Sequence, residues 1–117
     1  IPRNDKEARI SQVMKNFKFF GAPCALFCFV DCQMGPPQWS DLGMFLQTFM
    51  LLAKEAGLDT CAQEAWSLKH DCVSEFVRAE ASDLLFCGMA IGYKDDSAIV
   101  NSLKSERRSL KEWAKFL

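Results

Sequence analysis

The chain has 117 residues, of which 50% are hydrophobic and 25% charged, and its formal net charge is −1. This length corresponds to one domain that can bury a single core. The composition excludes a disordered tail, and without a surplus of basic residues we expect no nucleic-acid partner. The charged N-terminal residues show no apolar signal segment, so we expect a cytoplasmic protein.

Six cysteines and one histidine form no recognisable metal or disulfide pattern. Cys24, Cys28 and Cys32 recur every four residues in an apolar run. In a strand this spacing is too wide for one tetrahedral metal, whose sulfur ligands lie at about 2.3 Å. We therefore expect free thiols in a reducing compartment, and no metal ion.

The first half of the chain predicts a helix and then a strand. Residues 4–17 carry apolar side chains at helical spacing after Asn4 or Asp5, either of which can cap the helix. Residues 24–31 are apolar on both faces, which predicts a central strand in a sheet covered on both sides. The prolines of Gly35-Pro36-Pro37 predict a loop.

The longest predicted helix spans residues 39–56. Its uncharged stretch from Leu42 to Ala53 is shorter than the roughly 20 residues that cross a bilayer, so we expect no membrane contact. A helix that is apolar almost all round is normally buried on every side. Because a domain of this size cannot surround it, we expect one face to pack against a second copy.

The second half predicts a short extended segment at 58–66, a helix at 68–77 and a second clear strand at 83–93. Gly88 and Gly92 in that strand mark places where another backbone or a ligand comes close. The remaining residues predict an irregular polar segment and a C-terminal arm. This order predicts an α+β fold, with a small mixed sheet flanked by helices.

No common catalytic motif is present. His70 and Cys72 are two residues apart and point to different faces of a helix, so we expect His70 on the surface. Lys104, Arg107 and Arg108 either hold one phosphate or form a solvated charged loop, and the sequence leaves both interpretations open. Trp39, Phe45 and Trp66 likewise either line an acceptor site or serve in packing.

Taken together, residues 19–117 resemble the C-terminal half of nitroreductase-family flavoproteins, in particular those of the nitrobenzoate-reductase type. The resemblance covers some four-fifths of the chain, and each segment alone is weak, whereas their order and distances are specific. The segments are Phe-Phe-Gly-Ala-Pro at 19–23, the strand end Val30-Asp31, Gly-Pro-Pro-Gln-Trp-Ser-Asp-Leu-Gly-Met-Phe-Leu-Gln at 35–47, Ala-Gly-Leu-Asp-Thr-Cys at 56–61, Gln-Glu-Ala-Trp at 63–66, Cys-Gly-Met-Ala-Ile-Gly-Tyr at 87–93, Val100-Asn101 and Glu106-Arg107.

The resemblance implies a homodimer that binds FMN at its interface and uses NAD(P)H to reduce nitroaromatic or quinone-type acceptors. It matches helix 39–56 to the family's dimer helix, and the C-terminal arm to a segment that reaches over the partner. It matches Gln63, Glu64 and Ala65 to the loop whose backbone lies near flavin N5, where an N–H stabilises the reduced ring. It matches Lys104 and Arg107 to the residues that hold the FMN phosphate.

The sequence departs from the family at its front, where no Arg-x-Ser-x-Arg stretch for the flavin phosphate is found. We therefore expect residues 1–117 to form a single nitroreductase-like domain that lacks the family's N-terminal portion and is dimeric. Three interpretations remain open: an active FMN-dependent reductase, a non-catalytic dimeric remnant or small-molecule-binding protein without flavin, and a fragment or one half of a longer or two-chain reductase.

Overall fold

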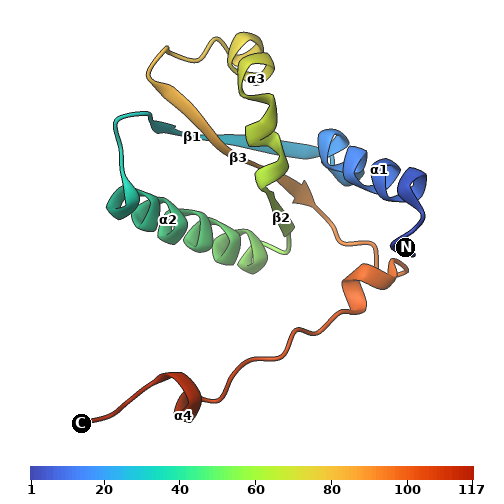
Figure 1. The fold of residues 1–117 in the computed structure, drawn as a ribbon, viewed down its shortest axis with the longest axis vertical. Coiled ribbons are helices and arrows are strands. Elements are labelled where there is room, and N and C mark those ends of the chain that lie inside the picture. Colours follow the sequence, from blue (N-terminus) through green and yellow to red (C-terminus); the bar gives the residue numbers. More distant parts are fainter.

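The computed structural model describes all of residues 1–117 (Figure 1). A three-stranded sheet forms its centre, and four α-helices and three short 3-10 helices surround or follow it. In chain order the elements are α1 (Lys6–Met14), η1 (Lys15–Gly21), β1 (Cys24–Asp31), α2 (Pro36–Glu55), β2 (Asp59–Gln63), η2 (Glu64–Lys69), α3 (His70–Val77), β3 (Asp83–Gly92), η3 (Ile99–Ser102) and α4 (Leu110–Trp113).

The sheet is antiparallel throughout, with the strand order β1-β3-β2. The α+β class is confirmed, but the expected mixed sheet is wrong. Strands β1 and β2 do run in the same direction, yet β3 inserts between them and runs opposite to both. For the same reason β1 lies at an edge of this sheet, not at its centre as its apolar sequence suggested, and β3 is the central strand.

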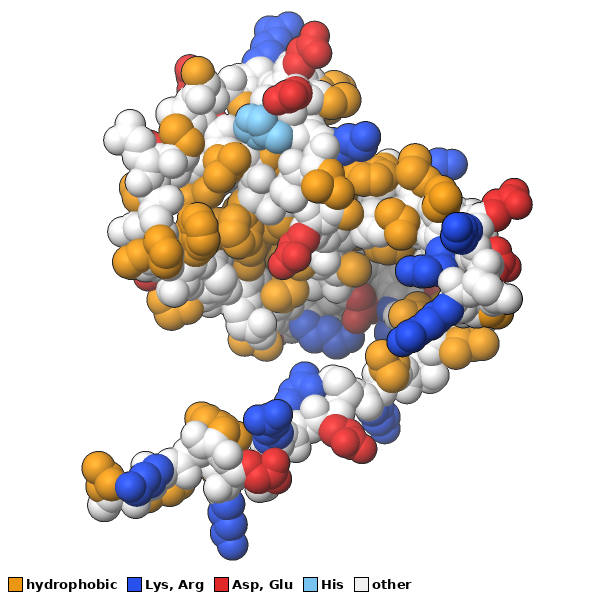
Figure 2. Space-filling view, viewed as in Figure 1, with side chains coloured by type: hydrophobic (Ala, Val, Ile, Leu, Met, Phe, Trp, Pro, Cys, Tyr) orange, Lys and Arg blue, Asp and Glu red, His pale blue; other side chains and the backbone are white.

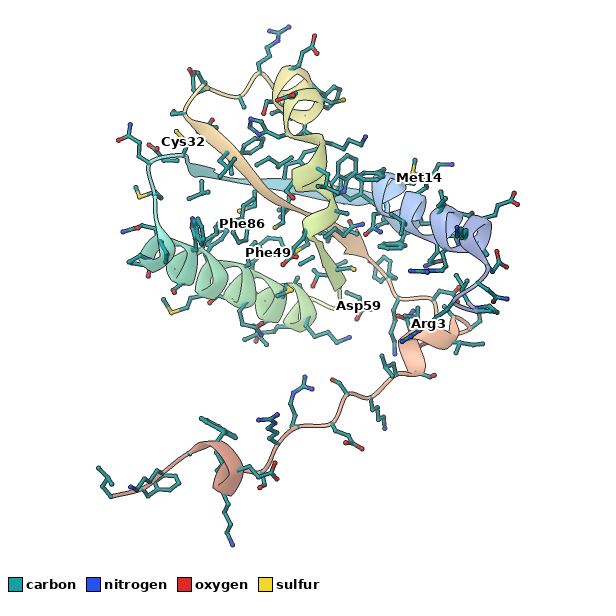
Figure 3. The ribbon with its side chains drawn as sticks, in the orientation of Figure 1. Arg3, Met14, Cys32, Phe49, Asp59 and Phe86 are labelled. Atoms are coloured by element: carbon teal, nitrogen blue, oxygen red, sulfur yellow. The ribbon has the colours of Figure 1, made fainter.

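Helix α2 covers one face of the sheet, and a small core of Cys28, Leu46, Cys87 and Met89 fills the space between them. The register between β1 and β3 shifts after the pair Cys28 and Cys87, which leaves Phe86 as an extra residue on β3. Phe86 packs against this core, on the side from which α2 presents Phe49 (Figure 3). The other face of the sheet carries η1, η2 and α3.

The first helix is shorter than the expected range 4–17. Its start is as predicted, because Asp5 Oδ1 accepts a hydrogen bond of 2.9 Å from the Ala8 N–H. The α-helix ends at Met14, and the chain tightens into the 3-10 helix η1.

Helix α2 begins at Pro36, three residues before the expected range 39–56. The loop expected at Pro36 and Pro37 is wrong, because both prolines occupy the first turn of a helix, where no N–H is needed. Gln38 closes this turn, since its Oε1 accepts a hydrogen bond of 3.1 Å from the Gly35 N–H. The proline pair therefore starts the helix.

The segment expected to be extended at 58–66 divides into β2 and the 3-10 helix η2. Helix α3 begins at His70, and β3 is confirmed with an end one residue earlier. The surface position expected for His70 is wrong: the side chain is half-buried, and its Nδ1 accepts a hydrogen bond of 3.3 Å from the Leu85 N–H. The predicted irregular segment at 95–111 contains the short 3-10 helix η3 and the start of α4.

Much of the apolar surface is exposed (Figure 2). The accessible area is 9757 Å², about 3,300 Å² more than a compact monomer of this mass presents. The radius of gyration is 17.0 Å, against roughly 13 Å for a compact chain of this length. Part of the excess belongs to the residues after β3, which run away from the sheet as an extended arm ending near α4 (Figure 1).

No helix of the structure combines the length and the apolar character needed to cross a membrane.

Candidate functional site

The loop that joins β2 to η2 contains the first group of predicted site residues. Gln63 is the last residue of β2 and lies opposite Gly88 on the central strand. Its side chain is only 3% exposed. Glu64 and Ala65 open η2, and the first N–H groups of a helix have no partner inside it. The N–H groups of these two residues are therefore not used within η2.

The Gln63 side chain links this loop to η1. Its Nε2 donates to the Asn16 backbone oxygen at 3.0 Å and to Asn16 Oδ1 at 3.3 Å. The Asn16 amide nitrogen in turn donates to the Val13 oxygen at 3.0 Å, which fixes the orientation of the amide. The opposite end of the Gln63 amide, Oε1, is buried without a hydrogen-bond partner.

Trp66 follows the loop and packs into an aromatic cluster. Its ring lies parallel to Phe19 with centroids 4.6 Å apart, and edge-on to Phe17 and Phe27 at 5.3 and 5.0 Å. The indole Nε1 is buried without a partner. Of the two interpretations left open for Trp66, the structure therefore supports packing.

The indole lies directly over Gly88. A Cβ atom added there would be 2.4 Å from Trp66 Cδ1, so only glycine allows this contact. At Gly92 an added Cβ would be 2.7 Å from Pro23 Cδ. At both glycines the close neighbour is a side chain of this chain, where another backbone or a ligand was expected.

The chain segment that carries Phe19 has an unusual backbone. Phe19 and Phe20 have φ angles of 48° and 54°, and Gly21 has 83°. Three successive residues thus adopt the left-handed region, which costs L-residues other than glycine roughly 1–2 kcal/mol each. The turn delivers the Phe19 ring onto Trp66, and this stacking helps offset its cost.

The second predicted group, Lys104 and Arg107, lies in the exposed arm beyond η3. Arg107 Nη1 donates only to its neighbours: to the backbone oxygens of Ser105 and Glu106, each at 3.2 Å, and to Ser105 Oγ at 2.5 Å. The arm leads away from the sheet, so one copy of the chain does not bring these cations to the loop at 63–65 (Figure 1). Their role as phosphate ligands stays a prediction.

The Asp59 carboxylate connects the start of the arm, at Lys94, to the sheet. Lys54 Nζ lies 2.7 Å from Asp59 Oδ1, and the Lys94 N–H donates to Asp59 Oδ2 at 3.1 Å. The hydrogen bond from Lys54, followed by that from Lys94, lowers the pKa of the Asp59 carboxyl. This carboxylate joins the ends of α2 and β3 to the start of β2.

The cysteine thiols are all free. Burial raises the pKa of Cys87 to about 11, with smaller contributions from Cys28 and Glu64, and burial also raises the pKa of Cys28. Both thiols therefore remain protonated near neutral pH. No group of three or more His, Cys, Asp or Glu side chains is arranged to hold a metal ion.

An open groove of about 510 Å³ lies away from the loop at 63–65, along α1, and is lined by side chains that include Ile10, Val13 and Met14.

Sequence reasoning missed Asn16, which holds Gln63, because a polar residue at the end of an amphipathic helix carries no sign of a partner 47 positions away.

The fold and the loop place this chain in a known class of protein. The family model described as the nitroreductase family matches residues 2–93, and the chain belongs to that family. Among curated relatives, a 4-nitrobenzoate reductase of Pseudomonas putida is 38% identical over 94% of this chain and 48% of its own length. A chloronitrobenzene nitroreductase of Comamonas testosteroni is 35% identical over 98% of this chain and 51% of its own length.

Solved structures agree with this assignment. The FMN and NADPH-dependent nitroreductase NfnB of Sphigopyxis sp. strain HMH matches with a TM-score of 0.93 and 42% identity, covering 100% of this chain and 52% of that one. The FMN-dependent NfnB of Mycobacterium smegmatis, solved with NADPH, matches with a TM-score of 0.95 and 28% identity over 100% of this chain and 52% of that one. The chain thus spans about half the length of the relatives it matches.

Proposed function

We propose that this chain works in an FMN-dependent oxidoreductase that uses NAD(P)H to reduce nitroaromatic or quinone-type acceptors. The observation that carries the proposal is the match of the whole chain to an FMN and NADPH-dependent nitroreductase at 42% identity. The names of the curated relatives, which are nitrobenzoate and chloronitrobenzene reductases, support nitroaromatic acceptors. All six cysteines are free, which supports the proposed reducing, cytoplasmic setting.

The residues of this chain fit part of a flavin site. When bound, FMN supplies the electron transfer, and the protein contributes orientation and electrostatics. The backbone N–H groups of Glu64 and Ala65, next to the buried Gln63, would donate hydrogen bonds to the flavin ring. Lys104 and Arg107 would neutralise the phosphate. No side chain is needed as a general acid in this scheme.

The two groups of residues act on one flavin only if two chains combine. Since the arm of a single copy leads away from its own loop, we propose that a second copy supplies Lys104 and Arg107 (Figure 1). The proposed homodimer would form through α2 and the arm. Met44 and Phe45 on α2 are 62% and 59% exposed, so this helix offers large apolar side chains to a second copy.

The second candidate function is a dimeric remnant, or a small-molecule-binding protein, without flavin. The observation that favours it is that a single copy holds the loop at 63–65 and the cations of the arm apart (Figure 1). In this case the fold persists, and the two groups of residues do not act on one cofactor. Each charge-assisted hydrogen bond that is lost would cost about 1.5–3 kcal/mol of binding free energy.

FMN titration separates these two functions. We expect the purified chain to bind FMN, seen as perturbed flavin absorbance, and to oxidise NADPH when 4-nitrobenzoate is present. Arg107→Gln should weaken FMN binding about 10- to 100-fold, as expected for a lost charge-assisted contact. Arg78→Gln, at an exposed arginine after α3, serves as the matched control and should change it little. A purified chain that takes up no FMN contradicts a flavin site built from these residues and supports the alternative without flavin.

The oligomeric state tests the proposed dimer. Phe45→Glu places a charge on the exposed face of α2, and we expect it to convert a dimer into monomers in light scattering after gel filtration. Phe76→Glu, at a residue on α3 that is 82% exposed, is the matched control and should remain dimeric. A wild-type chain that is monomeric at 100 micromolar, or a Phe45→Glu variant that stays dimeric, contradicts this interface.

A further inference from the structure

We infer that Gln63 is a positioning residue, which holds the backbone of Glu64 and Ala65 in place by fastening the loop to η1 through Asn16. The inference rests on the proposed function, in which this backbone faces the flavin. The family resemblance concerns the backbone of this loop, whereas the inference concerns the Gln63 side chain and Asn16. Gln63 does not itself need to touch the cofactor.

The first anchor is the hydrogen bonding of the Gln63 amide. Its nitrogen carries two protons, and both go to Asn16, at 3.0 Å and 3.3 Å. Asn16 is held in turn by Val13 through its own amide nitrogen. Because Oε1 of Gln63 has no partner, the two bonds to Asn16 are the only polar contacts of this buried side chain. Their loss would leave the whole amide unpaired away from water.

The second anchor is the aromatic stack of Trp66 on Phe19. Phe19 reaches it from the left-handed turn of η1. Such backbone strain persists only where the surrounding contacts determine it. The stack and the Gln63 amide join the same two segments, η1 and the loop, at two separate points.

The two anchors, Gln63 and Trp66, lie on either side of Glu64 and Ala65 in the chain. Gln63 comes directly before Glu64, and Trp66 comes directly after Ala65. Both anchors sit at Gly88, since Gln63 is its partner in the ladder and the indole lies on its Cα. The intervening two residues are fixed at both ends, which is the arrangement that precise placement of a backbone donor requires.

The test compares the backbone order parameters of single amide groups in variants of the full chain without flavin, measured by 15N NMR relaxation. Gln63→Met keeps the length of the side chain and removes its donors. We expect the order parameters of Glu64 and Ala65 to fall from about 0.85, typical of rigid backbone, to below about 0.6, while that of Met89 in the core changes much less. Gln12→Met makes the same change at an exposed position on α1 and should leave all three order parameters unchanged.

Measurements with FMN then test the chemical consequence. We expect Gln63→Met to weaken the binding of reduced FMN more than that of oxidised FMN. A tenfold change in the ratio of the two dissociation constants equals about 30 mV in the two-electron potential. A role limited to overall stability would shift both dissociation constants together and leave the ratio unchanged.

The outcomes separate this inference from the proposed function. If the wild-type chain binds no FMN, the flavin site proposed from these residues fails, and the order parameters of Glu64 and Ala65 still decide the positioning role. If Gln63→Met does not fold, Asn16→Ala, which removes one of the two acceptors, should show a smaller fall in order parameter at the same two residues. Order parameters of Glu64 and Ala65 that stay at the wild-type values in the folded variant would overturn the inference.

Discussion

Replacing Gly88 by alanine tests whether the Trp66 indole occupies the space over the central strand. The added Cβ would lie 2.4 Å from Trp66 Cδ1 and 2.9 Å from Cγ. These atoms belong to a rigid ring that is held by Phe17, Phe19 and Phe27, so the ring cannot move aside without losing contacts.

The sign of the expected change depends on this clash. In an open strand, replacing glycine by alanine stabilises a protein by about 0.5–1 kcal/mol. Forcing extra volume into a packed site costs about 1–3 kcal/mol, and disturbing the stack of Trp66 on Phe19 costs about 0.5–1.5 kcal/mol more. We therefore expect Gly88→Ala to lower the free energy of unfolding by about 1–3 kcal/mol.

Urea unfolding followed by circular dichroism measures the effect. The matched control is Gly43→Ala on α2, where an added Cβ has no atom within 4 Å, and we expect it to stabilise the chain by about 0.5–1 kcal/mol. In a Trp66→Ala background the clash is absent, so Gly88→Ala should become neutral or stabilising. If the loss is the same with and without Trp66, the reasoning is refuted.

Three further predictions concern single groups. His70→Ala leaves the buried Leu85 N–H without its acceptor and should lower the free energy of unfolding by about 1–3 kcal/mol, measured in urea, with His70→Gln recovering a part. The pKa of Asp59 is lower in the folded chain, mainly because of Lys54, so its stabilising contribution is present above the unfolded-state value of about 3.9 and disappears as pH falls through the folded-state value. The stability difference between wild type and Asp59→Asn should therefore shrink in acid unfolding below pH 4, and a constant difference contradicts this. Cys87, with a pKa of about 11, should react with a thiol reagent at pH 8 only as the chain unfolds. Fast reaction of all six thiols in the folded chain would show that the Cys87 thiol is accessible to solvent, which contradicts this.

The sequence predicted the strands better than their arrangement. The apolar run at 24–31 ends at turn residues on both sides and matches β1 residue for residue. The same run could not reveal that β1 lies at an edge, since an edge strand that is covered by other protein is as apolar as a central one. The prolines at 36 and 37 were misread because they exclude a helix interior but favour its first turn.

The candidate site was predictable only in part. Gln63, Glu64 and Ala65 were found through a resemblance, and the structure places them at a strand end, next to a 3-10 helix. The contact between Gln63 and Asn16 was not predictable, because it joins residues 47 positions apart and depends on how η1 folds back. The predicted contact of Lys104 with a phosphate does not arise within one chain, because the proposed phosphate site combines residues of two chains.

The edge position of β1 bears on how the isolated chain behaves at high concentration. Both β1 and β2 have one side without a neighbouring strand, and β1 is an eight-residue apolar segment. The proposed pairing through α2 would close after two copies, whereas joining β1 of one copy to β2 of the next leaves a new unpaired edge after every addition. Open-ended growth of this kind leads to fibres. In the isolated chain the proposed dimer would therefore compete with fibre formation, and a lower concentration would favour the dimer.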